Sequence, residues 1–179
     1  MLIQSILVSI WAFMNGRVFN EYFCWIIRGA PLVTGTITGI LMGDWKSGAM
    51  IGATIQLLYM GNVTVGGIAS YDKCYASIIA TAVCIGAHQT PEIAVTIAVT
   101  LGTLGLIASN IFMTVSVSFV HMADKAAEEG NLEKICFWHV VPPQILMFLL
   151  CVVPATAATY FGSTAVKGII DSLTGRPLT

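Results

Sequence analysis

The fold is decided by residues 31–72, which read PLVTGTITGILMGDWKSGAMIGATIQLLYMGNVTVGGIASYD. Two short apolar segments, residues 32–42 and 49–60, flank a polar break, and a glycine-rich polar turn at residues 61–67 follows them. A helix needs about 20 apolar residues to cross a bilayer, and neither segment reaches that length comfortably. Short, glycine-interrupted apolar segments that end in polar turns are typical of substrate sites in membrane transport proteins. We therefore expect the functional site in this stretch.

The composition indicates an all-α integral membrane protein. Of the 179 residues, 56% are hydrophobic and 9% are charged, whereas a soluble domain carries about 25% charged residues. The formal net charge of −1 provides no basic field for nucleic acid. The five cysteines include no C-x-x-C pair, so we expect buried thiols and no disulfide or metal framework.

The chain divides into four predicted regions. Residues 1–30 are expected to form an N-terminal interfacial or bent helix, and residues 31–92 a region of short, broken or re-entrant hairpins with the candidate site. Residues 93–161 contain two full-length spans joined by a charged loop, and residues 162–179 form an amphipathic tail. The scaffold of long spans would hold the hairpin region in the membrane.

The two spans are predicted at residues 93–120 and 137–161, which are long and free of charge. Between them, residues 121–134 carry the only strongly charged block, which we interpret as a solvated helix and turn with an end at Gly130. The prolines of the second span predict a bend there.

Glycines recur every four residues in the hairpin, at Gly35, Gly39 and Gly43 and again at Gly48 and Gly52. On a helix this spacing leaves a bare stripe against which another backbone can pack closely, and helix packing is its simplest explanation. The polar break between the two glycine runs would be the tip of a helix–turn–helix hairpin, exposed to water or to a polar cavity.

No residue pattern in the chain indicates catalysis. His88, His121 and His139 are isolated, without the i,i+4 partner of a metal-binding helix. The sequence also contains no nucleophile elbow, P-loop or dinucleotide fingerprint. We therefore predict no catalytic residue, no metal and no cofactor in this chain.

The polar residues that stand out in apolar surroundings are Gln56, Asn62, Thr64, Ser70 and Asp72. Gln56 lies inside an apolar segment, where an unpaired amide is costly, so it needs either a ligand or a structural hydrogen bond between helices. Asp72 follows the glycine-rich turn and could accept hydrogen bonds from a ligand; the alternatives are a loop cap or an ion pair with Lys73. Together such groups suit a neutral polyol better than an ion.

These residues resemble the IIC subunit of mannose-type sugar phosphotransferase systems, a branch that includes fructose, sorbose and amino-sugar systems. The resemblance covers nearly the whole chain. Its first motif comprises Pro31-Leu32, Gly43-Asp44-x-x-x-Gly48, Gln56, Gly61, Gly66 and Asp72. Its second motif comprises His121, Ala123-Asp124-Lys125-Ala126-Ala127, Gly130-Asn131-Leu132 and His139-Val140. A third stretch, Gly86-Ala87-His88-Gln89, also resembles the family.

The resemblance implies a multi-pass permease subunit of the bacterial inner membrane that binds and translocates a hexose or amino sugar. Such a subunit pairs with a IID membrane subunit, forms an oligomer, and leaves phosphoryl transfer to histidines of cytoplasmic IIA and IIB proteins. It is therefore not itself an enzyme. Carried onto this sequence, the sugar-binding candidates are Gln56, Thr64, Gly66, Ala69, Ser70 and Asp72.

The chain departs from the family pattern at three points. Many relatives have proline where Tyr71 stands, and an acidic residue is common at the position of Gln56. Relatives also continue with further membrane segments beyond the position of Thr179. The alternative expectation is therefore a truncated scaffold or docking subunit, with a role as bacteriocin or phage receptor and no transport of its own.

Overall fold

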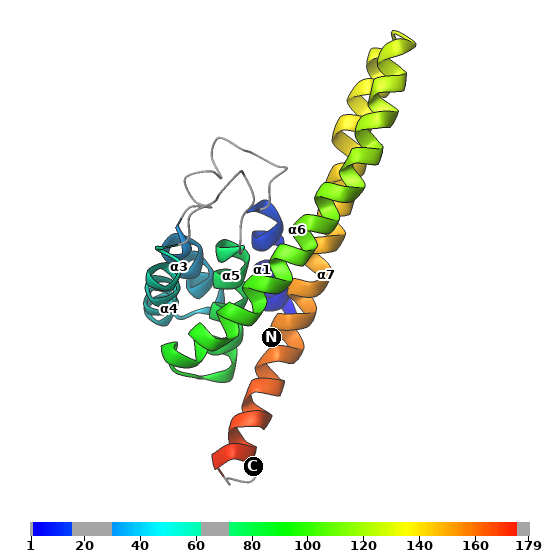
Figure 1. The fold of residues 1–179 in the computed structure, drawn as a ribbon. Helices are drawn as coiled ribbons and strands as arrows, with labels where there is room; N and C mark the ends of the chain where they lie inside the picture. Colours follow the sequence, from blue (N-terminus) through cyan, green and yellow to red (C-terminus); the bar gives the residue numbers. More distant parts are fainter. Residues whose placement is uncertain (1, 16–29, 62–71, 175–179) are drawn as a thin grey trace.

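The computed structural model describes residues 2–15, 30–61 and 72–174, and the regular structure in these ranges is entirely helical. The helices in chain order are α1 (Leu2–Met14), α3 (Pro31–Met42), α4 (Trp45–Leu58), α5 (Lys73–Ala87), α6 (Pro91–Glu128) and α7 (Leu132–Thr174). Figure 1 shows α6 and α7 as a long antiparallel pair, with the four short helices clustered beside one part of it. The predicted all-α class, with long spans and short hairpin helices, is confirmed.

Helices α3 and α4 form the predicted hairpin. Pro31 occupies the first turn of α3, and Gly43 ends it in the left-handed region with φ +91°, where glycine is favoured. Asp44 then caps α4, because its carboxylate accepts from the Ser47 backbone N–H at 3.1 Å. The Ser47 hydroxyl also donates to this carboxylate, and that bond is the main reason that the pKa of Asp44 lies below its ordinary value.

The glycine stripes bring the two hairpin helices into backbone contact. A Cβ built on Gly35 would lie 2.8 Å from the Gly52 Cα, and one on Gly39 would lie 2.7 Å from the Gly48 Cα. Neither distance leaves room for a methyl group, so glycine is required on both faces. The periodicity is therefore explained by helix packing, as the sequence suggested.

Helix α5 is the centre of the short-helix cluster, and 12 of its 15 residues are buried. Its small residues allow neighbours on both sides: Ala80 packs with Ile55 of α4, whereas Ile79 packs with Val8 of α1. The Ser77 hydroxyl donates to the Pro31 carbonyl at 2.9 Å and so joins α5 to the start of α3. Figure 1 shows α5 between the α3–α4 hairpin and the long pair.

Helices α6 and α7 are both long and apolar enough to cross a membrane, and only 17% of each most apolar window is buried. With 38 residues, α6 is about 57 Å long, which exceeds the bilayer core of about 30 Å. Its outward apolar side chains are those of a lipid-facing helix rather than of a soluble core.

The long pair continues further than the two predicted spans. Because Ala, Lys and Glu favour helix, α6 extends through the charged block to Glu128, and α7 begins at Leu132. The turn is confined to residues 129–131, where Gly130 has φ +67°. Helix α7 passes through three prolines and includes residues 162–174, which the sequence had assigned to a separate amphipathic tail.

Candidate functional site

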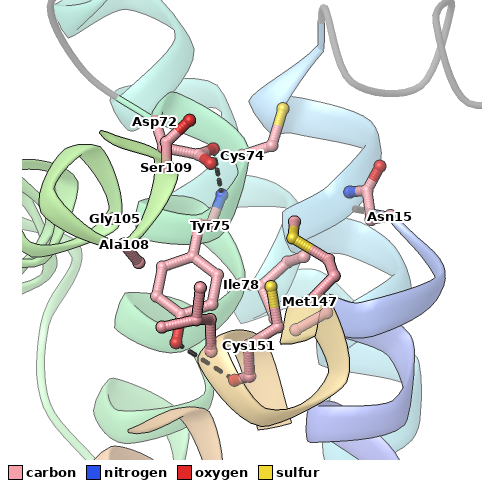
Figure 2. Close-up of a pocket in the computed structure, with 12 residues that line it drawn as sticks. Asn15, Asp72, Cys74, Tyr75, Ile78, Gly105, Ala108, Ser109, Met147 and Cys151 are labelled. Atoms are coloured by element: carbon pink, nitrogen blue, oxygen red, sulfur yellow. Dashed lines mark hydrogen bonds between the residues drawn. The ribbon is translucent and has the colours of Figure 1, made fainter. Parts of the chain in front are cut away.

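A polar cavity lies where α1, α5, α6 and α7 meet, on the hairpin side of the long pair (Figure 2). The space left for the centres of water molecules is about 30 Å³, which is enough for about two waters, since one needs roughly 10–15 Å³ by this measure. The residues that line it are Ala12, Asn15, Asp72, Cys74, Tyr75, Ile78, Gly105, Ala108, Ser109, Met147, Leu150 and Cys151.

Asp72 is the charged residue of this cavity and also the N-cap of α5. Its carboxylate accepts from the Tyr75 backbone N–H at 3.1 Å, which satisfies one of the unpaired donors at the helix start. An ionised carboxylate has about four acceptor sites, so the cap leaves acceptor capacity for a ligand. Among the described residues, no ion pair joins Asp72 to Lys73.

Glycines of α6 allow the Asp72 backbone to lie directly against that helix. A Cβ built on Gly105 would lie 3.0 Å from the Asp72 Cβ, closer than ordinary carbon contacts. The Asp72 backbone N–H points to the Gly102 carbonyl at 3.4 Å, which is a long hydrogen bond. A side chain at Gly105 would therefore displace Asp72 from the cavity wall, whereas a Cβ at Gly102 would lie 2.7 Å from the Tyr59 hydroxyl.

Tyr75 joins α5 to α7 across the cavity. Its hydroxyl donates to the Cys151 carbonyl at 3.2 Å, so the ring forms one wall of the space (Figure 2). Three residues beyond, Pro154 has no N–H and leaves the carbonyl of Leu150 without its helical donor. Because Leu150 lines the cavity, α7 places a backbone carbonyl without its helical donor beside the polar side chains of the cavity, although the helix itself is continuous.

Asn15 is a buried polar residue of the cavity, and its side chain has no hydrogen bond among the described residues. It lies directly after α1, and its exposed fraction is 6%. Neither the amide nitrogen nor the amide oxygen has a partner among the described residues. A buried amide without partners is uncommon in native proteins and calls for an explanation.

The structure separates the two described site candidates. Asp72 lines the cavity, whereas Gln56 lies on α4, outside the cavity, and its amide oxygen accepts from the Leu32 backbone N–H of α3 at 3.0 Å. Gln56 thus satisfies one of the unpaired donors at the start of α3. The other four predicted site residues, Thr64, Gly66, Ala69 and Ser70, lie outside the described residues.

Besides the apolar and cysteine residues of the lining, the sequence analysis missed three polar cavity residues, Asn15, Tyr75 and Ser109. Asn15 had a usable signal, because it interrupts an apolar run at the point where α1 ends. Tyr75 and Ser109 had none, because one aromatic and one hydroxyl residue among apolar neighbours are ordinary in membrane helices. Within the described ranges, no three His, Cys, Asp or Glu residues lie together as metal ligands would.

Two long apolar helices, with a short hairpin and a cavity that contains polar side chains beside them, define a helical integral membrane protein. A family comparison then makes the class specific: residues 2–179 match the family described as the PTS system sorbose-specific IIC component. The chain belongs to this family, the IIC components of the mannose class of phosphotransferase systems, as the sequence motifs indicated.

Individual relatives agree with this assignment. The mannose-specific EIIC component of Escherichia coli K12 is 32% identical over 143 residues, which are 80% of this chain and 54% of that protein. The sorbose-specific EIIC component of Lacticaseibacillus casei is 31% identical over 96% of this chain and 61% of its own length. This chain therefore spans about half to three fifths of these curated relatives.

A solved structure shares the fold as well. The cryo-EM structure of the mannose transporter ManYZ in complex with microcin E492 contains a chain that is 30% identical to this one, with a TM-score of 0.80. The superposition covers 97% of this chain and 69% of that chain. The helix arrangement in Figure 1 is thus an arrangement also found in a membrane transporter.

Proposed function

We propose that this chain is the membrane permease component of a mannose-type sugar phosphotransferase system, and that it binds and translocates a hexose or an amino sugar. The observation that carries the proposal is the carboxylate of Asp72 in a partly open cavity, with further polar groups on its lining, next to two helices of membrane-spanning length. A carboxylate held there can accept hydrogen bonds from sugar hydroxyls.

The size of the cavity supports a mechanism in which the helices move. Space for about two waters is too small for a hexose, so sugar binding requires the walls to separate. In the proposed alternating-access mechanism, the short-helix cluster moves as a unit against α6 and α7. The Asp72–Gly105 contact and the Tyr75–Cys151 hydrogen bond lie at the boundary between these two parts, and both would change during transport.

The proposed sugar site extends beyond the cavity. Thr64, Gly66, Ala69 and Ser70 precede Asp72 in the chain and are proposed as further contacts, together with Gln56. The amide oxygen of Gln56 is used by Leu32, so its part in sugar binding would come from the amide nitrogen. This proposal assigns no catalytic role to any residue of the chain.

We further propose the assembly in which this function operates. The chain would lie in a bacterial inner membrane, contact a IID subunit in an oligomeric complex, and deliver sugar to IIA and IIB proteins that carry the phosphoryl group. The support comes from family membership and from a structural relative described as a ManYZ complex.

Co-expression with a matching IID subunit tests the proposal. The purified complex should bind at least one of radiolabelled mannose, fructose, sorbose or N-acetylgalactosamine, and cells that also contain the phosphocarrier proteins should accumulate the phosphorylated sugar. A stable complex that binds none of these sugars and supports no uptake would refute transport and favour the scaffold alternative.

A further inference from the structure

We propose that Asn15 is a sugar-contacting residue, and that its amide binds a hydroxyl group of the ligand on the side of the cavity opposite Asp72. This inference rests on the proposed sugar-binding function. It starts from an observation that the fold leaves unexplained: an amide with an exposed fraction of 6% has no hydrogen bond on either polar atom among the described residues.

The position of the amide makes a ligand the simplest explanation. Asn15 follows the last residue of α1, and its backbone N–H is already used by the Trp11 carbonyl at 3.0 Å. The side chain is therefore the part left to interact. In Figure 2 its amide nitrogen is turned toward the other lining side chains, whereas Asp72 and Ser109 face the same space from the other side.

The polar groups around this space complement a diol. Asp72 supplies acceptor oxygens, Ser109 supplies a hydroxyl that can donate or accept, and Asn15 supplies two donors and one acceptor. Each sugar hydroxyl both donates and accepts, so one hydroxyl could donate to Asp72 while its neighbour accepts from Asn15. In the structure as it stands, the space between these polar groups has room for about two waters.

A purely structural asparagine makes a different prediction. If bound water only served to satisfy the buried amide, then replacing Asn15 by leucine, which has the same branched shape but no polar atoms, would not change the affinity for sugar. If the amide is held unpaired for a ligand, then leucine removes polar atoms that destabilise the ligand-free protein. The ligand-binding role therefore predicts weaker binding together with unchanged or higher thermal stability.

The test compares wild type, Asn15→Leu and the control Ser9→Ala in the purified complex with the IID subunit. Ser9 is a buried polar residue of α1, the helix that Asn15 follows, but it does not line the cavity. Its hydroxyl already donates to the Ser5 carbonyl and accepts from the Thr156 hydroxyl, both at 2.7 Å. The affinity for mannose and the other three sugars is measured by equilibrium binding, and the unfolding temperature is measured without sugar.

We expect Asn15→Leu to weaken sugar binding about tenfold, the effect of one lost hydrogen bond, without a lower unfolding temperature. We expect Ser9→Ala to lower the unfolding temperature and to leave the affinity unchanged. Singly deoxygenated analogues of the bound sugar give a second readout. One of them should bind weakly to wild type but should lose no further affinity in Asn15→Leu, because both changes remove the same contact.

Wild-type affinity in Asn15→Leu would overturn the inference while leaving the proposed function intact. Failure of the wild-type complex to bind any of the four sugars would overturn both. If Asn15→Leu does not assemble, Asn15→Ala replaces it, since the smaller side chain leaves space that water can fill. Unchanged sugar affinity in that variant would equally refute the role of Asn15.

Discussion

Asp72→Asn separates a ligand-binding carboxylate from a helix cap. Asparagine is as good an N-cap as aspartate, and its amide oxygen can accept from the Tyr75 N–H as the carboxylate does at 3.1 Å. The start of α5 should therefore be preserved, along with membrane insertion and partner binding. The change that remains at the cavity wall is the loss of one negative charge and the replacement of one acceptor oxygen by a donor.

The expected loss follows from the strength of a charge-assisted hydrogen bond. Such a bond contributes about 1.5–3 kcal/mol, so the sugar affinity of Asp72→Asn should fall roughly ten- to a hundredfold. The assay is equilibrium binding of radiolabelled sugar to the purified complex, with the unfolding temperature measured in parallel. Asp72→Ala should lose the same affinity and, in addition, about 1 kcal/mol of stability from the missing cap.

Asp44→Asn is the matched control for this experiment. Asp44 caps α4 through the Ser47 N–H at 3.1 Å in the same way, but it is exposed and does not line the cavity. Its replacement should leave sugar affinity unchanged. If Asp72→Asn also binds sugar with wild-type affinity, then Asp72 is only a helix cap and the argument for the position of the site fails.

Three further predictions concern the scaffold. Gly39→Ala should lower the unfolding temperature, because its Cβ would lie 2.7 Å from the Gly48 Cα on the facing helix. Gly168→Ala is the control and should not lower the unfolding temperature, because its Cβ would meet nothing within 4 Å. Equal effects of the two substitutions would refute backbone contact in the hairpin. His88→Gly should raise stability by about 1 kcal/mol, because His88 has φ 55° at the end of α5; a lower unfolding temperature would instead indicate contacts of the imidazole. Lys134→Met should raise the pKa of Glu129, which the hydrogen bond from Lys134 at 2.8 Å holds below its ordinary value, and a pKa that stays low by NMR titration would refute this pairing. A carboxyl group whose pKa is lower in the folded state stabilises the folded protein at pH values above its unfolded pKa, and this contribution is lost as the pH falls. Because Lys134→Met removes the cause of the low Glu129 pKa, the variant should lose less stability in acid than the wild type does.

Much of the fold was predictable because its helix boundaries are determined by local chemistry. Pro31 and Gly43 bound the first hairpin helix, Asp44 caps the second, and Gly130 makes the turn of the long pair. Each acts through its own backbone conformation or its nearest neighbours, which a sequence displays directly. The full lengths of α6 and α7 were harder to predict, because charged residues end a membrane span without ending a helix.

The candidate site was less predictable because it depends on contacts between distant helices. The sequence left open whether Gln56 meets a ligand or a protein group, and only the hairpin geometry places the Leu32 N–H beside it. The roles of Asp72 as cap and as cavity residue also looked like alternatives, yet one carboxylate serves both. Asn15 appeared only as an interruption of an apolar run, since its burial depends on the packing of four helices.

The double role of Asp72 bears on the kind of ligand that the cavity selects. The start of α5 carries a partial positive charge of about half a unit, because its first N–H groups point out of the helix. Alone, this helix end would attract an anion such as a phosphorylated sugar. The Asp72 carboxylate at the same place supplies a full negative charge, so an anionic ligand would be repelled while a neutral one can donate to it. On the proposed function, this site would therefore bind a neutral sugar in preference to its phosphorylated product.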